Sequence, residues 1–168
     1  MKHSAFFVCM LLLFAVELHA AKIYRGSSTA GSAAYNYSDS ESRLYRGSST
    51  AGSAIFTYER GDYPKIYRGS STAGSAAYTF EYSGSLIRMY RGSSTAGSAI
   101  YVWENGNYPR IYRGSSTAGS AAYTLEYSDP YLRLYRGSST AGSPIAVFEK
   151  WDGTPKPVLF FIAILIGE

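Results

Sequence analysis

Hydrophobic and polar residues alternate over short segments of this chain, and these segments recur about every 22 residues. Lys22–Gly26 is one such segment, and Ala99–Glu104 is another. Alternation of this kind, rich in β-branched and aromatic residues and bounded by Gly, Ser, Asn and Pro, is typical of β-strands. No repeat segment carries the 3.6-residue period of an amphipathic helix. The pattern therefore predicts an almost entirely β protein.

A nine-residue sequence, Tyr-Arg-Gly-Ser-Ser-Thr-Ala-Gly-Ser, ends the first strand of each unit and forms the turn to the second, and it occurs six times without a substitution. A fixed period in this range indicates a small supersecondary unit whose neighbours complete its core. Each repeat therefore reads as a β-hairpin, with its two strands on either side of the Ser/Gly-rich turn. The six nonapeptides begin at Tyr24, Tyr45, Tyr67, Tyr90, Tyr112 and Tyr135.

A second period, two repeats long, is superimposed on the first. The residue before the first aromatic in the second strand of each hairpin alternates between alanine and isoleucine. Alternation of small and large side chains allows neighbouring layers of side chains to interdigitate in a packed core. The larger unit is thus a pair of hairpins, present three times. The alternating residues are Ala34, Ile55, Ala77, Ile100, Ala122 and Ile145.

Three architectures fit residues 22–154. The favoured one is an elongated antiparallel array of six hairpins arranged as three pairs. A β-trefoil is the second, although its barrel and cap hairpins have different environments and all six repeats here share one nonapeptide. A β-solenoid is the third, but it would stack the nonapeptide arginines about 4.8 Å apart, where like charges destabilise.

The two ends of the chain differ from the repeats. Residues 1–21 place an uncharged apolar run, Ala5–Val16, between a polar start and the small residues Ala20 and Ala21, which is typical of a cleavable signal peptide. This predicts a secreted, cell-surface or periplasmic protein. At the other end, residues 155–168 hold nine consecutive apolar residues, Val158–Ile166, too few to span a bilayer as a helix. We expect this segment to cap the last hairpin, with a membrane-touching tail as the alternative.

The spacing Tyr-x-Gly-x-x-x-x-Gly, carried by Tyr24, Gly26 and Gly31 and repeated in every unit through residue 142, resembles the membrane occupation and recognition nexus (MORN) repeat. The resemblance covers residues 22–154. MORN repeats continue with a Gly-x-Gly, whereas this chain has residues 32–35, Ser-Ala-Ala-Tyr. The resemblance implies stacked hairpins and contact with phospholipid. The chain also looks like the short tandem-repeat proteins that bacteria secrete.

Several kinds of chemistry are excluded once the leader is removed, because Cys9, His3 and His19 all precede Lys22. Disulfides, Ser-His-Asp or Cys-His nucleophiles and Cys/His zinc sites are therefore impossible. Carboxylate chemistry such as glycoside hydrolysis is the enzymatic route that remains. Every recurring Glu belongs to a repeat, however, and no unique carboxylate pair stands out. We expect no catalytic residue, no metal and no cofactor.

Basic residues occupy two fixed positions in each repeat. The first set lies two residues before the repeat tyrosine and the second directly after it, so strand alternation puts them on opposite faces. Two interpretations stay open: a two-sided basic ribbon for anionic ligands, or cross-strand pairing with Glu59, Glu81, Glu104, Glu126 and Glu149. The first set is Lys22, Arg43, Lys65, Arg88, Arg110 and Arg133; the second is Arg25, Arg46, Arg68, Arg91, Arg113 and Arg136.

Aromatic residues form a second candidate surface. Pairs such as Tyr35/Tyr37 and Tyr101/Trp103 share one strand face, where exposure would make a sugar-stacking platform and burial would make the core. Burial is favoured, because few other large apolar residues are present. Tyr63 and Tyr108, each followed by proline in a turn, are the better exposed candidates.

Together these patterns predict an exported, non-enzymatic repeat protein that binds anionic or glycan polymers at the cell surface by avidity. Anionic polysaccharides or lipid headgroups are the expected partners, and nucleic acid is not favoured. The alternative is a self-associating structural protein with no small ligand. The candidate binding residues are Arg25, Arg46, Arg68, Arg91, Arg113, Arg136, Tyr63 and Tyr108.

Overall fold

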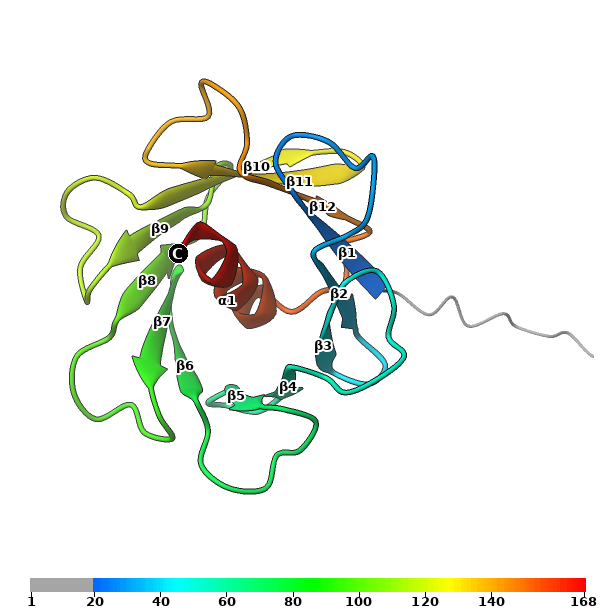
Figure 1. Ribbon diagram of the computed structural model, residues 1–168. Coiled ribbons are helices and arrows are strands. Elements are labelled where there is room, and N and C mark those ends of the chain that lie inside the picture. The colour runs from blue at the N-terminus through cyan, green and yellow to red at the C-terminus, as the bar shows by residue number, and fades with distance from the viewer. Residues whose placement is uncertain (1–19) are drawn as a thin grey trace, which may run out of the picture.

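In the computed structural model, which describes residues 20–168, the strands form a closed antiparallel barrel around a single helix (Figure 1). Each strand pairs with its neighbours in sequence, and the first strand pairs with the last. The strands are β1 (Ala20–Arg25), β2 (Tyr35–Ser38), β3 (Arg43–Arg46), β4 (Phe56–Glu59), β5 (Lys65–Arg68), β6 (Tyr78–Ser83), β7 (Leu86–Arg91), β8 (Tyr101–Glu104), β9 (Arg110–Arg113), β10 (Tyr123–Ser128), β11 (Tyr131–Arg136) and β12 (Ala146–Glu149), and the helix is α1 (Lys156–Gly167).

Closure of the barrel overturns the elongated open array that the sequence favours. At the seam between β1 and β12, Lys22 lies opposite Glu149 and Ile23 opposite Phe148. Between β4 and β5, which are adjacent in sequence, Lys65 lies opposite Glu59 in the same way. The seam is thus one more repeat interface, and it removes the two exposed edges that an open array would leave. The single closed meander also differs from the trefoil and the solenoid.

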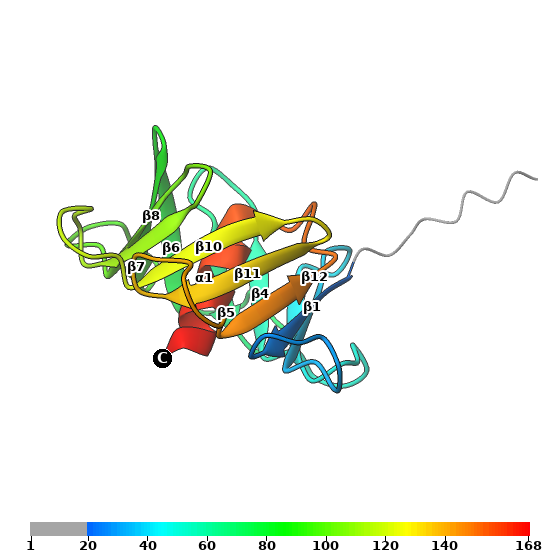
Figure 2. The same ribbon diagram turned by 90° about the horizontal axis from the view of Figure 1, so that it is seen from above.

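Helix α1 lies inside the barrel, as the end-on and side views show (Figures 1 and 2). Every residue from Pro157 to Gly167 is buried except the half-buried Leu165. A helix that is apolar on all sides is typical of a fully buried position. Residues 155–168, expected as a cap, therefore fill the lumen. Within residues 20–168 no helix is both long and apolar enough to cross a membrane.

The lumen-facing side chains of the strands pack on this helix. The Phe160 ring lies between Phe80 and Trp103, with centroid distances of 5.9 and 5.8 Å. Phe161 packs in the same way on Phe56, at 4.7 Å. The aromatic pairs of strand two thus belong to the core, as favoured from the sequence. The odd strands contribute the residue before each repeat tyrosine: Ile23, Leu44, Ile66, Met89, Ile111 and Leu134.

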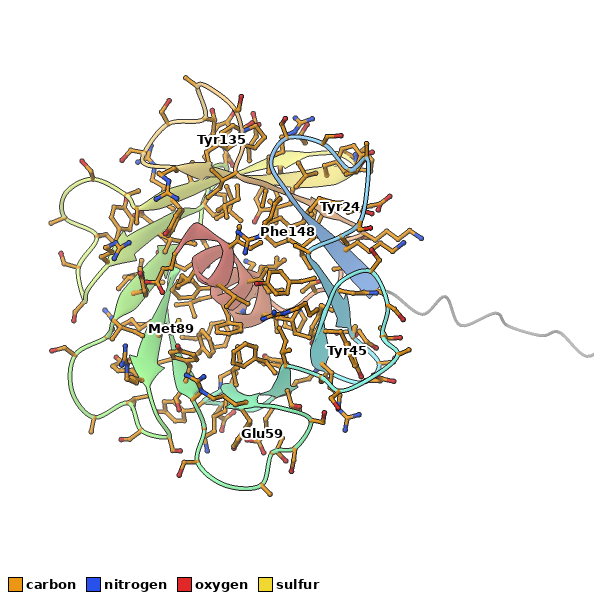
Figure 3. The ribbon with its side chains drawn as sticks, viewed as in Figure 1. Tyr24, Tyr45, Glu59, Met89, Tyr135 and Phe148 are labelled. Carbon is orange, nitrogen blue, oxygen red and sulfur yellow. The ribbon has the colours of Figure 1, made fainter. Side chains whose placement is uncertain are left out.

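The repeat tyrosines lie on the outer side of the wall, where a glutamate of the adjacent even strand holds each hydroxyl. The Tyr67 hydroxyl donates to Glu59 at 2.7 Å, and across the seam Tyr24 donates to Glu149 at 3.0 Å. Tyr45 instead donates to Glu41, because Ser38 occupies the glutamate position of β2. Figure 3 labels Tyr24, Tyr45, Tyr135 and Glu59 of this set. The remaining pairs are Tyr90–Glu81, Tyr112–Glu104 and Tyr135–Glu126.

The signal peptide predicted at residues 1–21 lies outside the described residues, except for its last two positions. Ala20 and Ala21 begin strand β1, where Ala21 is buried opposite Tyr37 of β2.

Candidate functional site

The six nonapeptide turns all lie at one end of the barrel, because each follows an odd strand and the odd strands run in the same direction. Figure 1 shows these loops spreading outward around the end at which α1 finishes. Gly26 and Gly31 have φ angles of +82° and +106°, a region that glycine adopts without strain. Ser28 Oγ accepts from the Ala30 amide at 3.0 Å, and the same turn bond recurs in all six repeats.

The first serine of the nonapeptide ties neighbouring loops together. Ser48 Oγ accepts from the Ala33 amide of the preceding repeat at 2.8 Å, and Ser70 does the same for Ala54 at 3.1 Å. The tyrosine, both glycines and the first two serines therefore each have a role in the fold. The nonapeptide arginine, alanine and final serine are exposed in every repeat.

The six nonapeptide arginines form what we call the arginine ring, at the end of the barrel where α1 finishes. Each is the last residue of an odd strand and is exposed. Neighbouring members are two strands apart, which places them about 10 Å from each other along the wall. The ring consists of Arg25, Arg46, Arg68, Arg91, Arg113 and Arg136.

The ring residues share the strand face of the lumen residues, and five of the six lie opposite the first aromatic of the neighbouring even strand, whereas Arg25 lies opposite Ala146. Arg68 follows the lumen residue Ile66 by two positions and lies opposite Phe56 in register. Arg113 lies opposite Tyr101, and its guanidinium carbon is 5.7 Å from that ring's centroid. This contact is a cation–π interaction at the mouth of the barrel.

The carboxyl end of α1 lies at this end of the barrel, on the side of β8, β10 and β11. Arg136 donates to the backbone carbonyl of Gly167 at 3.1 Å, and the Tyr101 hydroxyl donates to the Glu168 carboxylate. Burial and this carboxylate raise the pKa of Tyr101 well above its ordinary value. A helix carboxyl terminus carries partial negative charge, so the arginines around it stabilise it.

Positive charge nevertheless remains in large excess at this end. The six nonapeptide loops contain no acidic residue. Among residues 20–168 the ion pairs are Arg60–Asp39 and Arg88–Glu81, and neither includes a ring arginine. The six guanidinium groups therefore share this end with the Glu168 carboxylate, which is held by Tyr101 and not by a ring arginine.

The other set of basic residues lies on the outer wall, beside carboxylates. Lys65 is opposite Glu59, and Arg88 is opposite Glu81 with 3.9 Å between Nη1 and Oε2. The two-sided basic ribbon of an open array does not form. One set is largely offset by neighbouring glutamates, and the other set forms the ring.

Tyr63 and Tyr108 lie at the opposite end of the barrel, in the β4–β5 and β8–β9 connections, so the predicted binding residues form two separate groups. They are both 54% exposed, and Tyr82 and Tyr127 beside them are 51% and 40% exposed. Tyr127 stacks on the half-buried Trp151 with 5.1 Å between centroids. We call Tyr63, Tyr82, Tyr108, Tyr127 and Trp151 the aromatic end.

Sequence reasoning missed Tyr82, Tyr127 and Trp151. The sequence signal for them is an aromatic residue one or two positions after the recurring glutamate in the second strand of a hairpin, near the end of that strand. Beside Trp151 a shallow pocket of about 360 Å³ is lined by Asp129, Pro130, Glu149, Lys150 and Asp152. Within the described part of the chain no three His, Cys, Asp or Glu side chains gather to hold a metal ion.

Comparison with known proteins finds no match, whether among family models, curated proteins or solved structures.

Proposed function

We propose that this protein is a non-enzymatic module that binds anionic polymers through the arginine ring. The observation that carries the proposal is the gathering of six exposed arginines around one end of the barrel, none of which forms an ion pair within residues 20–168. Arginine presents a planar fork of donors that matches phosphate, sulfate and carboxylate groups. Contacts of this kind are weak singly and become strong when a ligand engages several at once.

A polymer fits this ring better than a small anion does. The negative end of α1 and the Glu168 carboxylate lie within the ring, held by Tyr101 and Arg136, which disfavours a small anion bound beside them. An extended chain can instead cross the rim and touch neighbouring arginines about 10 Å apart. Because the barrel gathers the arginines at one end, the contact lies across that end rather than along an elongated array.

The pattern of variation among the repeats supports a role for these arginines outside the fold. The buried residue before each repeat tyrosine changes between Ile, Leu and Met, as at Ile66, Met89 and Leu134. The exposed arginine after the tyrosine never changes. Cores tolerate such apolar exchanges, whereas Arg25, Arg46, Arg68 and Arg91 are exposed and form no ion pair within residues 20–168, so the fold gives no reason for their invariance. The apolar leader at residues 1–21 supports export, so the polymer is proposed to lie at the cell surface.

The test is binding to dextran sulfate, with uncharged dextran as the control polymer, over a range of salt concentrations. The R25Q/R46Q/R91Q variant removes three ring charges and keeps the Arg113 and Arg136 contacts. The matched K22Q/K65Q/R110Q variant removes three charges from the outer wall. We expect the ring variant to lose on the order of tenfold or more in affinity and to show a shallower salt dependence, because fewer counterions are displaced.

The wall variant is expected to bind within about twofold of the wild type, because its charges lie away from the ring. Equal losses in the two variants would mean that net charge, and not the ring, determines binding. Absence of salt-sensitive binding by the wild type would refute the proposal outright.

A further inference from the structure

The two ends of the barrel have opposite character, and the aromatic end is the more unusual. All four large hydrophobic side chains that are exposed within residues 20–168, namely Tyr63, Tyr82, Tyr108 and Tyr127, lie there. Exposed aromatic residues scattered singly over a surface need no explanation, whereas a cluster at one place indicates an interaction site. Tyr82 and Tyr127 lie near the ends of β6 and β10, whereas Tyr63, Tyr108 and Trp151 follow β4, β8 and β12, so the five occupy five of the six hairpin positions around the barrel axis.

Charge at the aromatic end is also opposite to that of the arginine ring. The connections between residues 39 and 156 that lie at this end hold five acidic residues against three basic ones. The arginine ring has six arginines against one carboxylate. The acidic residues are Asp39, Glu41, Asp62, Asp129 and Asp152, and the basic ones are Arg60, Lys150 and Lys156.

The two ends share one geometry, because the same six hairpins build both. Arginines at one end and aromatics at the other therefore recur at the same angular interval around the axis. When two molecules are stacked coaxially, guanidinium groups of one face tyrosine rings of the next. The chain already makes this contact internally, between Arg113 and Tyr101 at 5.7 Å. Arginine, tyrosine and tryptophan are also the residues that contribute most at protein interfaces.

We propose that the arginine ring of one molecule docks on the aromatic end of another, so that barrels stack head to tail. The contact joins two different surfaces of the same chain and does not close on itself, so repetition gives a linear filament. Anionic polymers and the aromatic end compete for the same arginines. Polymer binding therefore limits filament length, although stacking does not depend on polymer binding.

The decisive experiment is complementation between two variants in sedimentation velocity at low salt. R25Q/R46Q/R91Q weakens the ring and keeps the aromatic end, whereas Y63S/Y82S/Y108S weakens the aromatic end and keeps the ring. All six positions are exposed, and circular dichroism verifies that both variants fold. The wild type is expected to form a concentration-dependent series of larger species that shrinks as salt rises.

Each variant alone is expected to remain monomeric at protein concentrations at least tenfold above those at which the wild type assembles. Their mixture is expected to form a one-to-one dimer and nothing larger, because only one productive pair of ends remains. The K22Q/K65Q/R110Q variant should assemble like the wild type.

A wild type that stays monomeric at every concentration tested would overturn stacking, and so would a mixture that forms no heterodimer. Failure of stacking can be distinguished from failure of the proposed polymer binding. Y63S/Y82S/Y108S retains the ring and should bind dextran sulfate as the wild type does. Loss of polymer binding in that variant would instead place the polymer on the aromatic end.

Discussion

Replacement of Phe160 by alanine removes a large aromatic side chain from the middle of α1 and leaves the helix backbone in place. Phe160 is fully buried, and its ring makes edge-on contacts with Phe80 of β6 and Trp103 of β8, the two strands that flank β7. The change therefore tests whether the interior of the barrel is packed around the helix.

The expected cost follows from this burial. A fully buried Phe→Ala substitution costs about 3–5 kcal/mol, the higher values occurring where the surroundings cannot collapse into the cavity. Here the cavity is walled by a closed sheet on one side and the helix on the other, and both aromatic contacts are lost. We expect the free energy of unfolding to fall by about 4 kcal/mol, which is a large fraction of the roughly 5–15 kcal/mol that stabilises a domain.

The assay is urea unfolding, followed by tryptophan fluorescence and far-ultraviolet circular dichroism. Leu165→Ala is the matched control, because Leu165 lies on the same helix but is half-buried. The control should cost less than half as much as the loss of Phe160, because less apolar area leaves the core. If both variants lowered the free energy of unfolding by the same small amount, below about 1.5 kcal/mol, a helix packed in the lumen would be refuted.

Three further outcomes follow from particular contacts. Tyr24→Phe removes the hydroxyl that bonds Glu149 across the seam; we expect a cost of about 1 kcal/mol in urea unfolding, and a cost of several kcal/mol would mean that this bond holds the seam closed. Gly167→Ala places a Cβ 2.3 Å from the Tyr123 ring. Thermal unfolding should show that the free energy of unfolding falls by about 1–3 kcal/mol. A change no larger than that of an exposed surface substitution would contradict this packing. Burial raises the pKa of Tyr58 to about 12, so the stability that this neutral phenol contributes is complete below about pH 10 and is lost as pH rises through 12. The free energy of unfolding should fall over that interval and fall less in Tyr58→Phe.

The strands could be predicted from the sequence because each depends on residues close to it. The segment Lys22–Gly26 contains most of β1, and Ala99–Glu104 contains β8. The nonapeptide turn between the two strands of a repeat was equally clear, since its two glycines adopt positive φ. Alternation and turn chemistry are local properties, and the sequence states them directly.

Closure could not be predicted in the same way. Tyr24 bonds Glu149 at a separation of 125 residues, yet the same pair of residue types meets between adjacent strands at Tyr67 and Glu59. A pattern that satisfies every internal hairpin fits an open array and a closed barrel equally well. The helix was missed for a related reason. Val158–Ile166 is too short to span a bilayer, and the lumen that it fills exists only once the barrel is closed.

The candidate site was predicted by residue type but not by arrangement. The arginines and the exposed Tyr63 and Tyr108 were singled out. Their separation to opposite ends of the barrel follows from the direction of the strands around a closed wall. Tyr82 was missed because, next to Glu81, it reads as a continuation of the strand, and β6 does extend to Ser83. Only the three-dimensional structure places the Tyr82 side chain at the rim.

The number of hairpins in the barrel is not specified by the repeats, because each repeat interface has the same register, the seam included. Barrels of five or seven hairpins would make the same strand-to-strand contacts. The contents of the lumen distinguish them, since barrel diameter grows with strand number. Twelve strands spaced about 4.8 Å apart enclose a barrel roughly 20 Å across. Its axis then lies about 10 Å from the wall, a distance that is filled by one helix with a radius of about 5–6 Å together with the inward-facing side chains of the strands. A narrower barrel would exclude α1, and a wider one would leave a void beside Phe160 and Phe161. The apolar helix therefore selects the closed barrel of six hairpins, and it does so through contacts that no single repeat contains.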